Sequence, residues 1–391
     1  EWLDDDRLGA MLEGLADHAV EIWSAIIRRA VQDFQVELEW LHADTTSVYF
    51  EGAYEDEQGE PKREENGPLL VKGYNKDGRP QNVQFVLSLV TSKRRQGTAG
   101  LPVWYRPWDG NQSDDGVYLA DMSALRKMGW VPANVVLIGD RKLCNQETML
   151  AFCRTQQFFL AAHPWTDTAK AVWLSTWQEL QAGKREWTPA EYVSRNEAHK
   201  PFEKRTQYRV CEVEQALFDE QQQKTYLMRW VFSWSSRKSE QDARQRHKAL
   251  EAGEQALQRI ARLLGRYDYT SRAVIQPRID QALKKAKAQA YFKVTLTGSD
   301  EDQAWELRWE RRAEVLAQAE RFDGVMLLCT NVPIERLSAA GVMTKYKEQV
   351  NVEQTIDFIK SPVQIRPMWL HSPRRLAGLT LLIMIAVLVA G

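Results

Sequence analysis

The stretch Asn134-Val135-Val136-Leu137-Ile138-Gly139-Asp140 decides the fold class of this chain. Its apolar, largely β-branched residues predict a short strand buried on both faces, because such a strand needs apolar side chains at successive positions. Asp140 follows at the carboxyl end of this strand, which is where open α/β sheets place their functional sites. The stretch therefore predicts an α/β fold with a polar site at one end of a central sheet.

Further strand and helix patterns surround this strand. We expect strands over 36–50, 83–90, 102–108 and 158–162, and helices over 7–31, 113–128 and 147–156. Asp44 lies inside the first of these strands, in the run Leu-His-Ala-Asp-Thr-Thr-Ser. Strand alternation would place its carboxylate on a different face from its immediate neighbours. Asp44 and Asp140 are therefore candidates for one site.

After residue 163 the sequence becomes rich in Trp and charged residues. Here we expect strands over 207–214, 225–234 and 291–297, helices over 236–265 and 276–289, and a buried strand over 324–331. The 213 residues between Asp140 and Glu353 are too many for one connection. We therefore expect a large mixed insertion before the helix that carries Glu353.

The spacing Tyr346-x2-Gln349-x3-Glu353-x6-Lys360 predicts one polar helix face. At about 100° per residue these positions fall at roughly 0°, −60°, −20° and −40°. An apolar stripe lies beside them, formed by Val352, Ile356 and Ile359. The pattern is typical of a helix that packs inward and presents a site at its edge. A surface helix whose Glu and Lys are merely solvated is the alternative.

The composition limits the classes of function. A formal charge of −1 provides no overall attraction to nucleic acid, so any contact with DNA must come from local basic clusters. The four cysteines and six histidines show no zinc spacing, and no Gly-rich phosphate loop is present, so we expect no nucleotide cofactor. With no leader pattern at Glu1, we expect a cytoplasmic protein whose native N-terminal region is truncated.

The uncharged run from Leu376 to Gly391 offers a membrane alternative. A spanning helix needs about 20 apolar residues, and this run is shorter, so we expect a buried core helix and no membrane partner. Several aromatic and histidine side chains also allow two interpretations, either core packing or chemistry: base stacking for the tryptophans and metal or acid-base roles for the histidines. They are Trp230, Trp234, Trp305, Trp309, His42 and His163.

Taken in order, the blocks of this chain resemble a known family. The blocks are Asp44-Thr45-Thr46-Ser47, Lys72 to Pro80, Asp109-Gly110-Asn111, Ile138 to Arg141, Phe322-Asp323-Gly324 and Tyr346 to Glu353. They resemble the DDE transposases of bacterial insertion sequences, in the IS-four-like superfamily with the Tyr-Arg-Glu-Lys signature. The resemblance implies an RNase H-like core interrupted by a large mixed α+β insertion. We expect 1–35 to be an N-terminal helical remnant, 36–165 and 323–391 the two parts of the core, and 166–322 the insertion.

The resemblance also implies a site and a reaction. Asp44, Asp140 and Glu353 would be the catalytic residues and would bind two Mg²⁺ or Mn²⁺ ions, which carboxylate oxygens suit. Cut-and-paste transposition through a hairpin intermediate would follow, with double-stranded transposon ends and target as partners and a homodimer in the DNA complex. The expected DNA contacts are Tyr346, Gln349, Lys360, Arg141, Lys76 and Arg79.

Two positions depart from the family pattern. Gln349 stands where the signature has Arg, and it lacks the charge and the bidentate fork of that residue. Lys142 follows Asp140-Arg141 where a small residue is common. A catalytically degenerate transposase that only binds DNA is therefore one alternative, and a membrane-anchored interaction protein is the other.

Overall fold

The structure, a computed structural model, describes residues 4–50, 54–56, 58–74, 81–93, 100–113, 116–301, 304–360, 370 and 372–390. The chain forms two compact units. Unit 1 consists of Glu1–Pro164, Glu212–Val231 and Leu327–Gly391, and unit 2 of Trp165–Cys211 and Phe232–Met326. Each unit is described by itself below.

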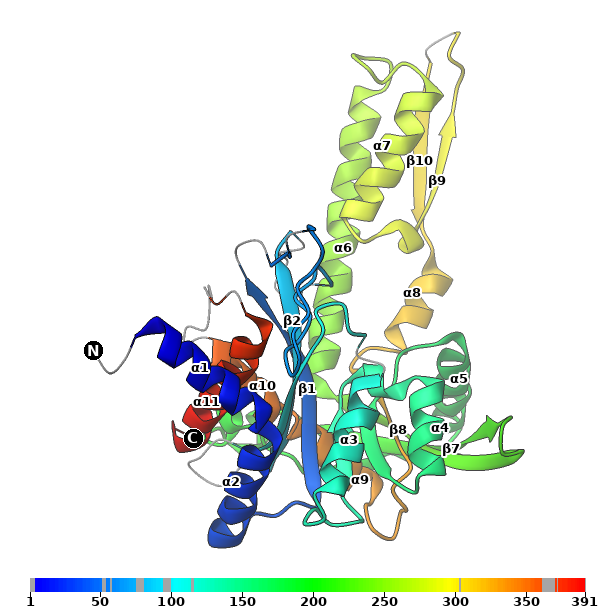
Figure 1. The fold of residues 1–391 in the computed structure, drawn as a ribbon. Helices are drawn as coiled ribbons and strands as arrows, with labels where there is room; N and C mark the ends of the chain where they lie inside the picture. Colours follow the sequence, from blue (N-terminus) through cyan, green and yellow to red (C-terminus); the bar gives the residue numbers. More distant parts are fainter. Residues whose placement is uncertain are drawn as a thin grey trace. The chain divides into compact units, whose positions relative to one another are not determined.

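A mixed sheet forms the centre of the fold (Figure 1), and it has nine strands in the order β3-β2-β1-β4-β5-β11-β8-β7-β6. Its strands are β1 (Trp40–Phe50), β2 (Val83–Ser92), β3 (Pro102–Trp108), β4 (Val136–Gly139), β5 (Phe158–Ala162), β6 (Thr188–Ala190), β7 (Tyr208–Asp219), β8 (Lys224–Ser235) and β11 (Val325–Thr330). β4 is parallel to both β1 and β5, whereas β2 is antiparallel to β1 and β3. The expected α/β class with a central sheet is confirmed.

Helices cover both faces of the sheet in unit 1. They are α1 (Asp5–Asp17), α2 (Ala19–Phe34), α3 (Val117–Lys127), α4 (Gln146–Arg154), α9 (Ala339–Lys347), α10 (Val350–Lys360) and α11 (Pro373–Ala390). On one face, Trp23 of α2 packs edge-on against Tyr105 of β3. On the other, the Trp104 indole donates to Asp121 of α3. Figure 1 shows α2 and α10 on one side of β1, and α3 and α4 on the other.

Apolar side chains explain the central position of β4. Val136, Leu137 and Ile138 are fully buried, as expected for a strand with helices on both faces. Gly139 is tight, because a Cβ there would lie 3.0 Å from Leu143 Cδ1 and 3.3 Å from the Tyr118 ring. Glycine therefore fits at the last position of β4, next to Tyr118 of α3. Asp140 follows directly.

Unit 2 has its own apolar core. Its remaining elements are α5 (Asp167–Gln181), α6 (Ser236–Leu263), α7 (Arg272–Lys285), β9 (Phe292–Thr297), β10 (Glu306–Arg311) and α8 (Ala313–Glu320). Leu257, Ile275 and Ile279 belong to one buried cluster, against which Trp305 and Trp309 pack. The packing interpretation of these two tryptophans is thus confirmed. Because α6, α7, β9 and β10 share this cluster, we call them the helical module (residues 236–312).

The expected single helix over 7–31 is wrong, because the chain forms α1 and α2 with His18 between them. No Gly or Pro marks this break. Asp17, the last residue of α1, accepts hydrogen bonds from Arg374 Nε (3.0 Å) and Asn66 Nδ2 (3.1 Å). Contacts between residues far apart in sequence therefore accompany the break, and a local pattern does not contain them.

α11 is the buried helix expected near the end of the sequence. Leu376, Leu381 and Met384 are completely buried, and the helix packs against α1. Within the described residues, no helix combines the length and apolarity needed to cross a bilayer.

Candidate active site

Asp44 and Asp140 occupy corresponding positions on two neighbouring parallel strands. β1 pairs with β4 in a register that places His42 opposite Ile138. Asp44 lies two residues beyond His42, and Asp140 lies two residues beyond Ile138 in a backbone that is still extended. Because side chains alternate along strands spaced about 4.8 Å apart, both carboxylates project to the same face of the sheet.

Hydrogen bonds orient both aspartates. The Tyr118 hydroxyl donates to Asp140 Oδ1 (2.8 Å), and so does the backbone N–H of Lys142 (3.0 Å), where Asp140 caps a short 3-10 helix. In the same way, Asp44 Oδ1 accepts from the N–H of Thr45 (2.7 Å). A carboxylate has two oxygens, so one oxygen can be held by the protein while the other takes a ligand.

Glu353 reaches this region from α10. The helix packs against β1 and β2 through Val352, Ile356 and Ile359, whose exposure is 0%, 6% and 1%. The predicted apolar stripe is therefore confirmed. Glu353 itself is exposed. Protein atoms around its carboxylate nevertheless displace part of the surrounding water, and this desolvation, followed by the negative charge of Asp357, raises the pKa of Glu353 above its usual value.

The expectation of one continuous helix from Tyr346 to Lys360 is wrong. A turn at Glu348 and Gln349 separates α9 from α10, and the N–H groups of these two residues bond to carbonyls three residues back instead of four. Tyr346 therefore belongs to α9, whereas Glu353 belongs to α10. The two side chains belong to different helices on either side of a turn.

The side chain of Gln349 accounts for this turn. It is only 7% exposed, and its Nε2 donates to the carbonyl oxygen of Ala43 on β1 (2.8 Å). Its Oε1 lies 3.2 Å from Nδ1 of the buried His42, which must carry the proton because Oε1 can only accept. Gln349 thus ties the turn to the strand next to Asp44. Since its amide faces the interior, we no longer propose it as a DNA contact.

A small polar cluster continues from His42. Its Nε2 lies 4.0 Å from Glu348 Oε2, and neither atom has a hydrogen-bond partner among the described residues. Lys93 and Lys345 contact the same carboxylate at 3.5 and 3.6 Å. Burial lowers the pKa of His42 to about 4 despite the Gln349 hydrogen bond, so the imidazole is neutral near pH 7. The structural interpretation of His42 agrees with these contacts.

The pKa of Tyr346 depends on all three predicted carboxylates. Its pKa is raised to about 12, first by burial and then by the negative charges of Asp140, Glu353 and Asp44, with a contribution from Cys144. Charges act over short distances in proteins. The three acidic residues come from β1, the end of β4 and α10, and the negative charge of each raises the pKa of the same phenol.

The other predicted DNA contacts differ in their exposure and in whether the structure describes them. Arg141 is exposed beside Asp140, and Lys360 is half-buried at the end of α10. Lys76 and Arg79 lie outside the described residues. Among the histidines, His163 contacts the Trp230 ring at 4.7 Å, and burial lowers its pKa.

The donors present are the oxygens that Mg²⁺ and Mn²⁺ prefer. The charges that act on Tyr346 are negative, and so is the charge of Asp357, which acts on Glu353. This chemistry fits a divalent cation. Among the described residues, however, no three His, Cys, Asp or Glu side chains lie close enough together to hold one.

A cavity of about 700 Å³ lies elsewhere in unit 1. It is lined by side chains from α2 and the edge strand β3, among them Trp23, Tyr105, Arg106 and Trp108. The Arg106 guanidinium sits over the Trp108 ring at 4.0 Å. None of the three carboxylates lines this cavity. The candidate site is therefore identified from its side chains and not from a pocket.

A scan against protein-family models and a search of curated proteins both found no match. The site therefore rests on its own geometry. Tyr118, which holds Asp140, was not singled out in the sequence, because a Tyr at helical spacing carries no signal that distinguishes an active-site donor from a core residue.

Proposed function

We propose that this chain is a DDE-type transposase that cuts DNA at transposon ends and joins them to a target. Asp44, Asp140 and Glu353 would be its metal ligands. The observation that supports this best is the action of all three carboxylates on the Tyr346 phenol. Unrelated surface acids that are far apart in sequence are expected to scatter. These three come from separate elements and all raise the pKa of one tyrosine.

The fold is compatible with this proposal. A mixed sheet with helices on both faces is what an RNase H-like core requires, and Asp44 and Asp140 follow the register of two parallel strands. The insertion that the family resemblance implies, residues 166–322, overlaps most of unit 2, although Glu212–Val231 within it belongs to unit 1.

Mg²⁺ or Mn²⁺ at this site would activate water and stabilise the leaving oxygen of a phosphodiester. Asp44, Asp140 and Glu353 would hold these ions through their carboxylate oxygens. The described carboxylates do not surround a single point.

The neighbouring residues would position the DNA. With a pKa of about 12, Tyr346 stays protonated at neutral pH, so it can donate a hydrogen bond to a phosphate oxygen without adding negative charge. Arg141 and Lys360 would supply positive charge beside the carboxylates, and Lys76 and Arg79 remain proposed contacts. The hairpin intermediate and the homodimer on double-stranded DNA belong to the same proposal.

Conservative substitutions of the ligands test the proposal. Asp44→Asn, Asp140→Asn and Glu353→Gln should each reduce Mg²⁺- or Mn²⁺-dependent cleavage of supercoiled plasmid DNA by at least about 10³-fold, since a metal ligand contributes several kcal/mol to the transition state. Electron paramagnetic resonance should also show weaker Mn²⁺ binding by each variant. Far-ultraviolet circular dichroism should match the wild type.

Asp357→Asn is the matched control. Asp357 is an exposed carboxylate one turn after Glu353 on α10, so its loss removes the same charge from the same helix. This variant should keep cleavage within about threefold of the wild type, because it removes no ligand. Retained cleavage in any of the three ligand variants would refute the site.

A binding-only transposase is the second candidate. It is favoured by Gln349, whose amide is engaged by His42 and Ala43 in the interior at the position where the resembled signature has Arg. Under this function, the wild-type chain binds duplex DNA but leaves plasmid intact with either ion. Cleavage that depends on Glu353 excludes it.

A further inference from the structure

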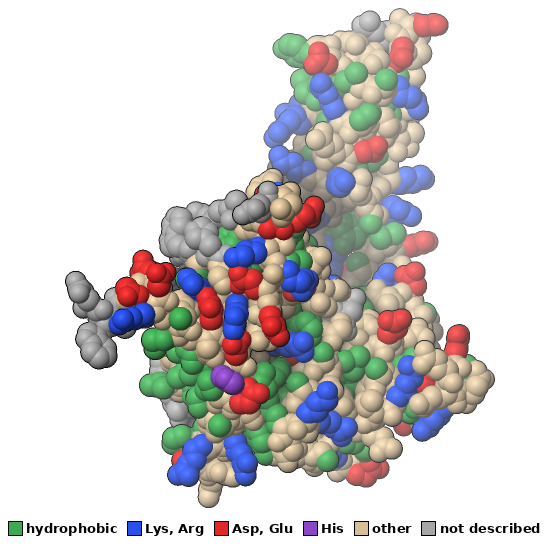
Figure 2. Space-filling model, in the orientation of Figure 1, with side chains coloured by type: hydrophobic (Ala, Val, Ile, Leu, Met, Phe, Trp, Pro, Cys, Tyr) green, Lys and Arg blue, Asp and Glu red, His purple; other side chains and the backbone are tan. Residues whose placement is uncertain are grey.

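The helical module carries a local excess of positive charge. Residues 236–312 contain 17 lysines and arginines against 11 aspartates and glutamates, a formal charge of +6 in a chain whose total is −1. Figure 2 shows Lys and Arg side chains along the length of this module. The charge is therefore concentrated, and its placement on α6 decides what it can bind.

Five cations lie on one face of α6. Leu250, Gly253, Leu257 and Ile260 are buried and mark the core side of this helix. At about 100° per residue, the opposite face carries five exposed side chains that fall within about 60° of one another. They are Arg237, Arg244, Lys248, Arg259 and Arg262, and we call them the α6 basic stripe.

The stripe differs from an ordinary solvated helix face. Such a face normally mixes both signs at neighbouring positions. Here Arg244 pairs with Glu240 at 3.1 Å, whereas no described acidic residue forms an ion pair with the other four cations. Gln241 and Gln255, which can also donate hydrogen bonds, lie between them on the same face. Two exposed acids, Glu240 and Glu251, lie at the edge of this face and pair with Arg244 and His247, so the five cations outnumber the acids beside them.

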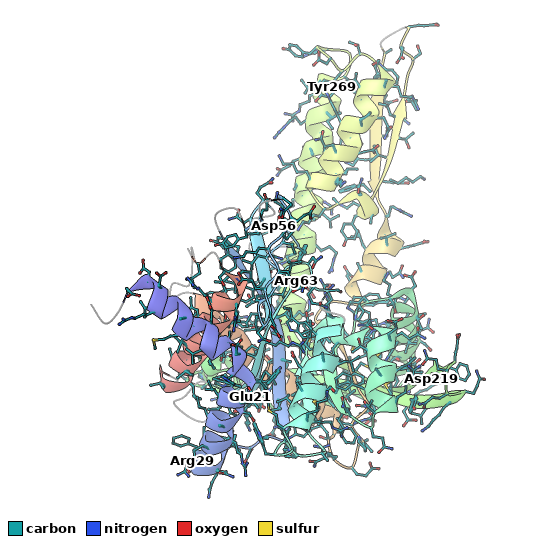
Figure 3. The ribbon with its side chains drawn as sticks, in the orientation of Figure 1. Glu21, Arg29, Asp56, Arg63, Asp219 and Tyr269 are labelled. Atoms are coloured by element: carbon teal, nitrogen blue, oxygen red, sulfur yellow. The ribbon has the colours of Figure 1, made fainter. Side chains whose placement is uncertain are left out.

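The length of the stripe suits a duplex. From Arg237 to Arg262 it extends about 37 Å at 1.5 Å per residue, which corresponds to about 11 base pairs. Packing keeps the helix in place. The loop after it is fixed by the Trp305 indole, which donates to Thr270 O (3.0 Å), and by Arg278, whose guanidinium lies 4.4 Å from the ring of Tyr269 (labelled in Figure 3).

We propose that the α6 basic stripe is a second nucleic-acid surface, which binds the phosphate backbone of double-stranded DNA without reading its sequence. This surface is distinct from the carboxylate site, because no residue of the α6 basic stripe belongs to that site. The face offers guanidinium and ammonium groups and no aromatic platform, so it matches phosphates and not unstacked bases. A rigid, evenly charged duplex is therefore the occupant that we favour over single strands.

The experiment removes the stripe and compares it with an equal loss of charge elsewhere. The stripe variant carries Arg237→Gln, Arg244→Gln, Lys248→Gln, Arg259→Gln and Arg262→Gln. The control variant changes five other exposed cations of the helical module to Gln. They lie on α7, on the turn after α7, on β9 and on β10, and they are Lys284, Lys285, Lys287, Lys293 and Arg308. Both are made in the full chain with Glu353→Gln, so that DNA stays intact. Fluorescence anisotropy with a 30-base-pair duplex of arbitrary sequence then gives affinity against salt concentration.

We expect the stripe variant to bind the duplex at least about tenfold more weakly at 0.1 M salt. The slope of log affinity against log salt should fall by about 3, because each lost phosphate contact contributes about 0.9. The control variant should change this slope by less than about 1. Equal effects of both variants would show that only net charge matters and would overturn the proposal, as would a stripe variant with wild-type binding.

The outcome is independent of cleavage. If the Glu353-intact chain cuts no DNA but the stripe variant loses duplex binding, the stripe stands and the proposed enzyme function fails. If the chain cuts DNA and the stripe variant binds the duplex normally, the proposed enzyme function stands and the stripe proposal fails. Stronger loss of binding to a single-stranded oligonucleotide than to the duplex would overturn the choice of occupant.

Discussion

Gln349 has a buried side-chain amide, which joins the turn before α10 to β1. Its carboxamide bonds to His42 and to the Ala43 carbonyl, and both partners lie within two residues of Asp44. A buried hydrogen-bonding group is costly to leave without a partner. The pair therefore fixes the distance between β1 and the turn that leads to Glu353.

A double-mutant cycle measures this coupling. Gln349→Ala and His42→Ala should each lower the free energy of unfolding by about 1–3 kcal/mol, because each leaves a buried group unpaired. The double variant should cost less than the sum of the two, with a coupling of about 0.5–3 kcal/mol. Urea unfolding provides the values. Gln354→Ala, at an exposed position of α10, serves as the control, and strict additivity of the pair would contradict a direct contact.

Asp121 makes stability depend on pH. It is 1% exposed, and burial raises its pKa to about 6, although the Ser88 hydroxyl, the Trp104 indole and the charge of Arg106 oppose the shift. The folded state therefore holds a proton that the unfolded state loses near pH 3.8. This contribution to stability is present below that pH and is lost as the pH rises to about 6.

Asp121→Asn should remove this dependence while it keeps an acceptor for the Trp104 indole. One pKa unit corresponds to about 1.4 kcal/mol, and part of the effect is already lost at pH 4, so the variant should gain about 2 kcal/mol relative to the wild type between pH 4 and pH 7. Urea unfolding at both pH values tests this. Asp33→Asn, at an exposed position of α2, is the control, and a gain that is the same at both pH values would contradict the titration.

Individual site residues could be predicted to different degrees. Asp44 and Asp140 were named from strand alternation and a strand end, and the structure places Asp44 in β1 and Asp140 directly after β4. The inward turn of Gln349 was not, since it depends on His42, which is 307 positions away in the chain. Local patterns contain no information about such a partner.

At the scale of elements, the packing of α11 on α1 depends on Gly378. A Cβ at this position would overlap the carbonyl oxygen of Leu12 in α1. The overlap involves backbone, which cannot rotate away as a side chain can. The close approach of the two helices therefore requires a residue without a side chain.

Gly378→Ala should push the two helices apart and lower the free energy of unfolding by about 1–3 kcal/mol, the usual cost of overpacking. Gly14→Ala in α1 is the matched control, because a Cβ there meets no atom within 4 Å. The control should be about 0.5–1 kcal/mol more stable, since Ala suits a helix interior better than Gly. Equal effects of the two changes, measured by thermal unfolding, would argue against the close contact.

Strong periodicity decided which elements could be predicted. β2, β3, β5 and α6 have the expected type and lie within a few residues of the expected bounds. Breaks inside helices were missed at His18 and Glu348, because neither contains Gly or Pro. The short strand β10 and the helix α5 were also missed, since their mixed polar and aromatic composition gives no clear period.

For the whole molecule, charge is distributed unevenly. The helical module has a formal charge of +6, so the remaining residues together carry −7. Net charge alone therefore hides a cationic surface and an acidic site in one chain. Such a distribution lets a polyanion bind locally while the carboxylates attract cations.

The order of segments in unit 1 has a consequence for synthesis. Asp44 and Asp140 are made before α10, whose Glu353 is made 213 residues after Asp140. At about 5–20 residues per second, a ribosome needs roughly 10–40 s for that interval. A nascent chain therefore holds two of the three acids long before the third exists. Under the proposed function, the growing protein therefore has no complete set of ligands with which to cut DNA until α10 has been made.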